Sequence, residues 1–195
     1  SNATMSNGNL SFSGTYNWKS SLAFDKGKWY AEIKMTNANA YNPMVGIAQV
    51  GNSNVDNPSS TNYPGGFPNS VSYERTGNIF QNGGSATQSG LPTFAQNDIM
   101  SIAVDLESAT KTIKWYKNGT LAATENITQT FDEPYVFFTY ASGSQAGEGD
   151  WNFGNGFFGT TAITSAGSNG NGSLFEYDVP SGYYALNTKN LNTYG

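Results

Sequence analysis

The sequence predicts an all-β fold, an antiparallel β-sandwich or jelly roll, and three observations lead to it. Apolar residues recur at every second position in several short segments, which is the period of a strand with one buried face. Many glycines, 23 in all, and many asparagines separate these segments, as turn residues do in antiparallel proteins. No segment shows a helical period of apolar residues, so we expect no helix.

Each expected strand follows from its own pattern. Apolar and polar residues alternate in the segments 28–35, 98–106 and 112–118, so each segment is expected to bury one face. The residues expected on these buried faces are Trp29, Ala31, Ile33 and Met35 in the first segment, Met100, Ile102, Val104 and Leu106 in the second, and Ile113 and Trp115 in the third. Residues 43–51 and 134–140 are apolar on both faces and predict interior strands, with Gly46 where another segment packs closely. The pair Asn118-Gly119 predicts a tight hairpin. Residues 51–78 form the longest stretch without strand periodicity, and long loops are often functional.

Composition excludes several classes of function. The net charge is −5 and only one of the nine basic residues is an arginine, so we expect no nucleic-acid partner. The chain has no Cys and no His, which removes Cys–His nucleophile pairs and the usual zinc site. No apolar run approaches about 20 residues, so we expect no insertion into a membrane.

Six short motifs occur in a fixed order. They are KGKWYAEI (residues 26–33), VGIA (45–48), NDIMSIAVDL (97–106), TIKWYKNG (112–119), PYVFF (134–138) and WNFG (151–154). This series resembles the SPRY domain family. The resemblance implies a concanavalin A-like sandwich of two antiparallel sheets that binds partners, without catalysis and without a cofactor, through loops at one end.

The resemblance also suggests how the chain is divided. We expect residues 1–3 to be an expression-tag remnant, residues 4–160 to form the SPRY-like sandwich, and residues 161–195 to be an extension that packs on it or trails it. Residues 164–173 are the best candidate for a linker. The segment 175–191 is similar to segments that follow such domains in phage and viral proteins. This second likeness predicts a virion or tail-associated protein, with a possible homo-oligomer in the particle.

The candidate binding residues lie outside the periodic segments. They are Tyr41, Asn42, Tyr63, Phe67, Arg75 and Gln145. Aromatic rings and arginine often anchor binding, because they bury a large area at low entropic cost or donate paired hydrogen bonds. The alternative for Tyr63 and Phe67 is that they fix the long loop to the sandwich. The adjacent Trp115 and Tyr116 point to opposite faces, and we expect Trp115 in the core rather than on a ligand.

Two chemical alternatives have some support. Asp105 and Glu107 share a strand face, as the carboxylates of some sandwich glycosidases do, but they fall at a hairpin end and predict a solvated turn instead. Glu148 and Asp150 could contact calcium, yet two carboxylates are too few, so we predict a flexible loop and no metal site. The predicted function is therefore non-catalytic recognition of a protein or a surface glycan. The rivals are a carbohydrate-binding module and, less favoured, a sandwich glycosidase.

Overall fold

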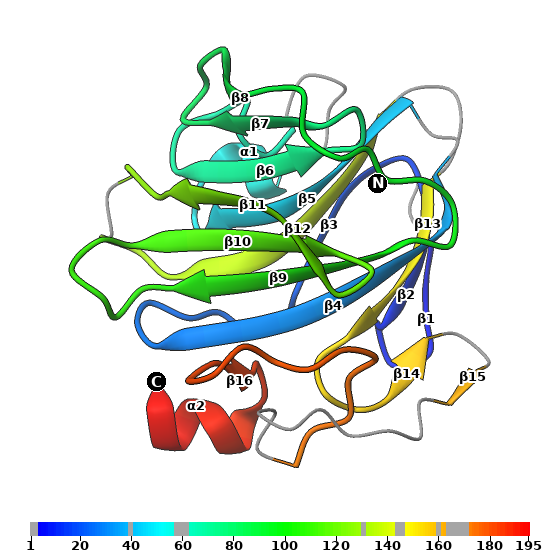
Figure 1. Ribbon diagram of the computed structural model, residues 1–195, viewed down its shortest axis with the longest axis vertical. Coiled ribbons are helices and arrows are strands. Elements are labelled where there is room, and N and C mark those ends of the chain that lie inside the picture. Colours follow the sequence, from blue (N-terminus) through cyan, green and yellow to red (C-terminus); the bar gives the residue numbers. More distant parts are fainter. Residues whose placement is uncertain are drawn as a thin grey trace.

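The computed structural model describes residues 4–38, 41–56, 63–129, 132–142, 147–158, 161–162 and 172–195. It is a sandwich of two β-sheets, which confirms the predicted fold class (Figure 1). Sheet A contains, in spatial order, β1 (Thr4–Ser6), β2 (Ser11–Gly14), β13 (Gly147–Asn152), β4 (Lys28–Asn37), β9 (Ile99–Asp105), β10 (Thr112–Lys117) and β11 (Thr120–Asn126). Sheet B contains β3 (Tyr16–Lys19), β12 (Tyr135–Ser142), β5 (Tyr41–Gln49), β6 (Ser70–Glu74), β7 (Asn78–Gln81) and β8 (Ala86–Gln88).

Strand pairing within both sheets is antiparallel, with one exception. The short strand β16 (Tyr184–Ala185) joins sheet A by pairing in parallel with the first half of β4. A separate two-stranded ribbon pairs β14 (Phe157–Phe158) with β15 (Thr161–Ala162). Sequential neighbours such as β9, β10 and β11 pair directly, because the loops between them are short enough to close hairpins.

The core lies between the sheets and follows the predicted alternation. Sheet A contributes the faces that contain Trp29, Met100 and Trp115, all fully buried, and sheet B contributes Val71 and Phe137. The Trp115 ring also donates a hydrogen bond of 3.1 Å from Nε1 to a backbone carbonyl of β5. The prediction that Trp115 belongs to the core is confirmed. Because its side chain is fully buried, the ring cannot stack on a ligand.

The close packing expected at Gly46 is also confirmed. A Cβ atom on Gly46 would lie 2.0 Å from the carbonyl oxygen of Val71 on the neighbouring strand β6. No real side chain tolerates such a contact, so only glycine allows β5 and β6 to pair here.

The outer face of each sheet is covered as well. On sheet B, Val55 and Phe67 from the segment between β5 and β6 pack over β12, where they contact Phe138 and its neighbours. On sheet A, the C-terminal residues Phe175 and Val179 pack over Tyr30 of β4 and its neighbours. The molecule therefore has four layers, and the apolar pattern on both faces of 134–140 reflects the covering of sheet B.

Two sequence predictions about this region are wrong. Helix α1 (Ser53–Asp56) and helix α2 (Thr188–Tyr194) exist, but each is too short for a helical period to emerge. Residues 70–74, expected in a loop, form β6, whose five residues are all buried. Serine is usually an exposed residue, but here the hydroxyls of Ser70 and Ser72 donate hydrogen bonds to backbone carbonyls of the covering segment.

Asparagines close many of the turns. Every non-glycine residue with positive φ in the described ranges is an asparagine: Asn7, Asn9, Asn42, Asn69, Asn82, Asn97 and Asn118. Asparagine adopts this left-handed conformation more readily than other residues with a Cβ atom. The predicted hairpin at Asn118-Gly119 is confirmed, with φ of 47° and 80° at the two positions.

Candidate functional site

Six chain connections meet at one end of the sandwich, on the right in Figure 1. We call this end the rim. The register shows the convergence, because Glu148 at the start of β13 pairs with Asn37 at the end of β4, and Ser142 at the end of β12 pairs with Tyr41. The rim consists of the connections β2–β3, β4–β5, β6–β7, β8–β9, β10–β11 and β12–β13.

Three of the six predicted binding residues belong to the rim by their place in the chain. Tyr41 opens β5, although its side chain lies outside the described part of the structure. Asn42 follows it, half-buried, with a φ of 48°. Arg75 directly follows β6. Gln145 lies outside the described residues, in the connection whose two ends, β12 and β13, reach the rim.

Arg75 connects three segments of the rim. Its guanidinium donates a hydrogen bond to the carbonyl of Ala38, and its backbone N–H donates to Pro43 at 2.9 Å. Its own carbonyl accepts from the N–H of Phe94 at 3.1 Å. The arginine chosen as a binding candidate is therefore also an internal brace, and it remains half-buried.

The other two candidates do not reach the rim. Phe67 is buried on the outer face of sheet B, with 4 % of its surface exposed. Tyr63 is half-buried beside it, with ring centroids 5.9 Å from Phe80 and 6.1 Å from Tyr140. This arrangement corresponds to the alternative raised from the sequence, in which the two rings fix the covering segment to the sandwich.

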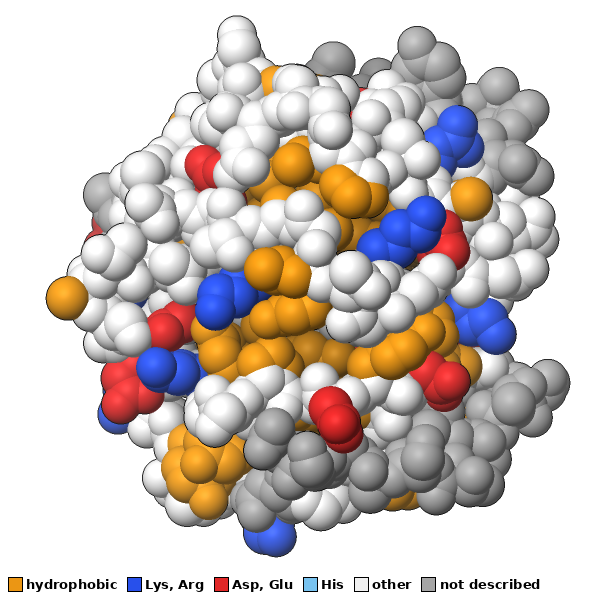
Figure 2. Space-filling model, viewed as in Figure 1, with side chains coloured by type: hydrophobic (Ala, Val, Ile, Leu, Met, Phe, Trp, Pro, Cys, Tyr) orange, Lys and Arg blue, Asp and Glu red, His pale blue; other side chains and the backbone are white. Residues whose placement is uncertain are grey.

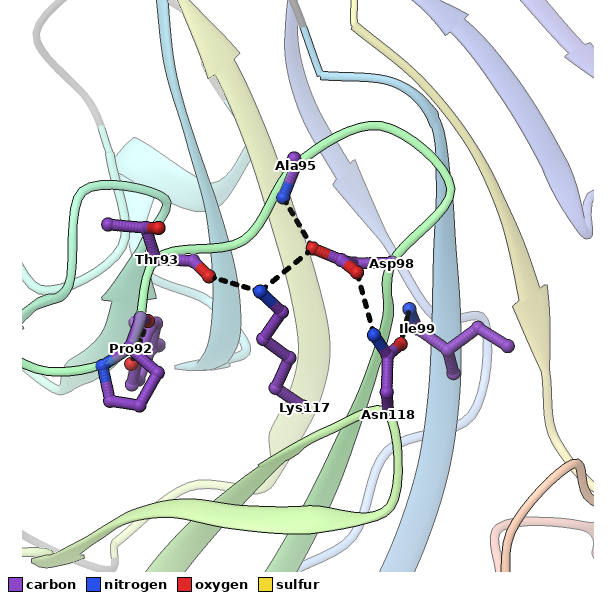
Figure 3. Close-up of polar contacts among 8 residues, drawn as sticks. Pro92, Thr93, Ala95, Asp98, Ile99, Lys117 and Asn118 are labelled. Atoms are coloured by element: carbon purple, nitrogen blue, oxygen red, sulfur yellow. Dashed lines mark hydrogen bonds and ion pairs between the residues drawn. The ribbon is translucent and has the colours of Figure 1, made fainter.

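Within the rim, Asp98 fixes the β8–β9 connection to the neighbouring β10–β11 hairpin (Figure 3). The sequence search for binding residues did not select Asp98. The Asp98 carboxylate accepts hydrogen bonds from Ala95 N–H at 2.8 Å and from Asn118 Nδ2 at 2.7 Å. It also lies 3.2 Å from the Lys117 ammonium, which donates to the carbonyl of Thr93 at 2.7 Å. The hairpin β10–β11 thus fixes the segment that precedes β9.

These contacts determine the charge state of Asp98. Partial burial alone would raise its pKa, but the hydrogen bonds from Asn118 and Ala95, together with Lys117, outweigh burial and lower the pKa below its usual value. Asn118 Oδ1 also accepts from the N–H of Ile99 at 2.9 Å. Asp98 is the second residue of motif 97–106 and Asn118 the last but one of motif 112–119, so both lie in motifs read from the sequence, but the sequence did not show that they lie close together.

The charged side chains form no continuous basic area on the face shown in Figure 2, where Lys and Arg lie among Asp and Glu. A binder of duplex nucleic acid needs such an area to replace counterions. Within the described ranges no three His, Cys, Asp or Glu residues cluster as metal ligands would. No helix there is long and apolar enough to cross a membrane.

The carboxylates considered for catalysis have structural contacts. Asp105 accepts the backbone N–H groups of Glu107 and Ser108 at 3.0 and 2.8 Å, and Lys28 lies 3.1 Å away. Against the effect of partial burial, the bonds from Ser108, Lys28 and Glu107 lower the pKa of Asp105. The turn predicted at this position is confirmed, and Asp105 stabilises it at the end opposite the rim.

The segment that contains Glu148 and Asp150 is ordered, contrary to the prediction of a flexible loop. It forms β13, which pairs with β2 on one side and β4 on the other. Glu148 accepts a hydrogen bond from the Ser13 hydroxyl, and Asp150 accepts one from Ser11. Both carboxylates therefore connect neighbouring strands of sheet A.

Two motif residues meet inside the molecule. Glu32 of β4 is fully buried, and its carboxylate accepts the backbone N–H groups of Glu176 and Tyr177 at 2.8 and 2.9 Å. Asn152 donates to Glu32 at 3.3 Å and to the carbonyl of Leu174 at 2.9 Å. Burial raises the pKa of Glu32 to about 7, in spite of these donors. The pair attaches the C-terminal segment to sheet A.

With this geometry established, residues 28–156 match the SPRY domain family. The chain belongs to the SPRY domain family. SPRY domains generally serve as non-catalytic modules for protein interaction. The motifs that carried the resemblance lie on β4, β5, β9, β10 and β12 and at the end of β13, in the order expected.

Solved SPRY structures share the fold at low sequence identity. A human SPRY domain is 16 % identical, with a TM-score of 0.58, and the match covers 77 % of this chain and 95 % of that one. The SPRY domain of human HERC1 is 18 % identical, with a TM-score of 0.57 and coverage of 76 % and 91 %. The TRIM65 PSpry domain is 12 % identical, with a TM-score of 0.56 and coverage of 75 % and 84 %. No curated protein matches the sequence.

Proposed function

We propose that this SPRY domain is a non-catalytic binding module that recognises a protein or a surface glycan through the rim. One observation carries the proposal. The rim gathers Asn42, Arg75 and the start of β5, and the Asp98 network holds the neighbouring β8–β9 segment in place. A surface ordered before binding loses little conformational entropy when the partner arrives.

The chemistry of the rim favours neutral, polar recognition. Exposed residues of the β8–β9 segment include Thr93, Gln96 and Asn97, which donate and accept hydrogen bonds without charge. Leu121, with 53 % of its surface exposed, adds an apolar group beside the β10–β11 hairpin. Such a mixture suits a partner that presents backbone amides or hydroxyls around a small apolar contact.

The test combines Tyr41→Ala and Arg75→Ala in one chain. Partners are first isolated from candidate host lysate and on a glycan array, and their affinities are then measured by biolayer interferometry. We expect affinity to fall at least about 10-fold, because a few anchors supply most binding energy. Asp25→Asn, at an exposed site on the opposite end, serves as a control. Unchanged affinity in a double variant that keeps its circular dichroism spectrum refutes recognition through the rim.

We further propose that the protein is part of a virion, because residues 175–191 are similar to segments that follow such domains in phage and viral proteins. Mass spectrometry of purified virions from the source of the gene tests whether the protein is part of the virion. Light scattering of the isolated chain tests the associated homo-oligomer. Particles that lack the protein would exclude the virion location and leave recognition through the rim to its own experiment.

A further inference from the structure

A cavity of about 500 Å³ lies away from the rim, at the other end of the sandwich. Its walls come from three parts of the chain: the turn between β1 and β2, the end of β3 with the residues that follow it, and the start of α2. Ligand sites for small molecules have volumes of about 300–1,000 Å³. The cavity is therefore large enough for one ring-sized ligand.

Two aromatic rings form the apolar floor of this cavity. Trp18 and Phe153 both line it, with centroids 6.4 Å apart and planes inclined by only 22°. Trp151, which does not line the cavity, stacks with Trp18 at 4.9 Å and with Phe153 at 5.4 Å. The two rings therefore pack against a third ring, which fixes their orientation. Half-buried Phe153 supplies most of the aromatic surface open to the cavity, because only 6 % of Trp18 is exposed.

Neutral polar groups and aliphatic side chains share the walls. Asn9, Asn17, Asn187 and exposed Ser21 contribute the polar part, with Asn17 Nδ2 already donating to the carbonyl of Asn54 at 3.3 Å, and the aliphatic part comes from Met5, Leu10, Leu22 and Leu186. Asn187 uses its side-chain oxygen to cap α2, by accepting from Asn190 N–H at 2.9 Å, which leaves its amide N–H groups as donors. The lining contains one charged residue, Lys19, and no carboxylate.

We propose that this cavity binds a neutral sugar ring of the pyranose type. One face of a pyranose consists of C–H groups and packs on an aromatic ring, while its hydroxyls project sideways and need both donors and acceptors. Side-chain amides supply both, and an aromatic floor bordered in part by amides matches this division of the ligand. The site is separate from the rim and does not depend on what the rim binds.

An apolar side chain of a peptide is the main competing occupant. It would cover Trp18 and Phe153 equally well, but it would leave the surrounding amides without hydrogen-bond partners. The polar wall therefore favours the sugar. Binding of one small ring through few contacts gives a dissociation constant on the order of 1 mM, so the assay must detect weak binding.

The experiment is an NMR titration of the ¹⁵N-labelled full chain with the methyl glycosides of glucose, galactose, mannose and N-acetylglucosamine. The indole N–H signals of Trp18 and Trp151 report on the cavity. Two variants accompany the wild type. Ser21→Trp places a large side chain in the cavity mouth without altering the core, and Ser85→Trp adds the same residue at an exposed turn elsewhere.

We expect at least one glycoside to shift the two indole signals in a saturable way, with the same affinity in Ser85→Trp and at least about 10-fold weaker binding in Ser21→Trp. The proposal is overturned if no glycoside shifts the signals, or if Ser21→Trp binds as the wild type does. It is also overturned if an aliphatic probe such as cyclohexanol shifts them at lower concentration than every sugar. Partner binding at the rim is measured on the same variants, so failure at one site is distinguishable from failure at the other.

Discussion

Asp98→Asn tests whether the rim is ordered by the network in Figure 3. The substitution keeps the size of the side chain but removes its charge and replaces one acceptor oxygen with a donor. The variant lacks the ion pair of 3.2 Å between residue 98 and Lys117, and it lacks one of the strong hydrogen bonds from Ala95 N–H or Asn118. Hydrogen bonds to a charged group contribute about 1.5–3 kcal/mol each. Because the Lys117 side chain is 31 % exposed, water screens part of this interaction.

We therefore expect the free energy of unfolding to fall by about 1.5 kcal/mol at pH 7, which corresponds to a melting temperature lower by about 3–6 °C. Urea denaturation followed by tryptophan fluorescence measures the difference. Asp25→Asn, which removes the same charge from an exposed side chain, should change the free energy by less than about 0.5 kcal/mol.

The pH dependence adds an independent check. The folded-state pKa of Asp98 is lowered, so its contribution is present above the unfolded pKa, about 4, and disappears as the pH falls through the folded value. The difference between wild type and Asp98→Asn should accordingly shrink as the pH falls through the lowered pKa of folded Asp98. A difference that persists at low pH, or one no larger than that of Asp25→Asn, refutes the assignment of Asp98 as the electrostatic anchor of the rim.

Three further outcomes follow from the core and the buried carboxylate. Because burial raises the pKa of Glu32 from 4.5 to about 7, the folded state retains this proton to higher pH than the unfolded chain. The free energy of unfolding should therefore fall as the pH rises from about 4.5 to about 7, and urea titrations should show a flatter profile in Glu32→Gln. Gly46→Ala should prevent stable pairing of β5 with β6, at a cost above about 3 kcal/mol, whereas Gly84→Ala, with its nearest neighbour at 3.5 Å, should fold normally by circular dichroism. Trp115→Phe should lower the free energy of unfolding by about 2–4 kcal/mol, through a lost hydrogen bond and a cavity, and Leu121→Ala at an exposed position should not; urea denaturation measures both.

The strands that could be predicted are those whose own residues record burial. The alternation of Trp29 to Met35 indicated one buried face of β4, and the apolar run 134–140 indicated that both faces of β12 are covered. Strand β6 was missed because Ser70 and Ser72 are buried under the segment just before them, where their hydroxyls donate to the carbonyls of Phe67 and Pro64, and residue type alone does not record that cover. Helix α2 was missed because seven residues with one capping asparagine, Asn187, leave no period to detect.

The site was predictable only in part, for a similar reason. Residue type suggested Arg75, and its position after β6 places it at the rim. Type alone could not distinguish Phe67, which is buried under its own segment, from a ring that meets a partner. Asp98 and Asn118 lie 20 residues apart, and their contact depends on the pairing of β9 with β10.

The attachment of the C-terminal residues through Glu32 has a practical consequence for anyone who shortens this protein. Cutting the gene after the family match, near residue 156, would strip Phe175 and Val179 from Tyr30 and leave a buried carboxylate without its backbone donors. The fragment would expose a large hydrophobic surface, and we expect it to aggregate into inclusion bodies during expression. Fragments intended for crystallisation or for fusion to reporters should therefore keep everything through residue 195.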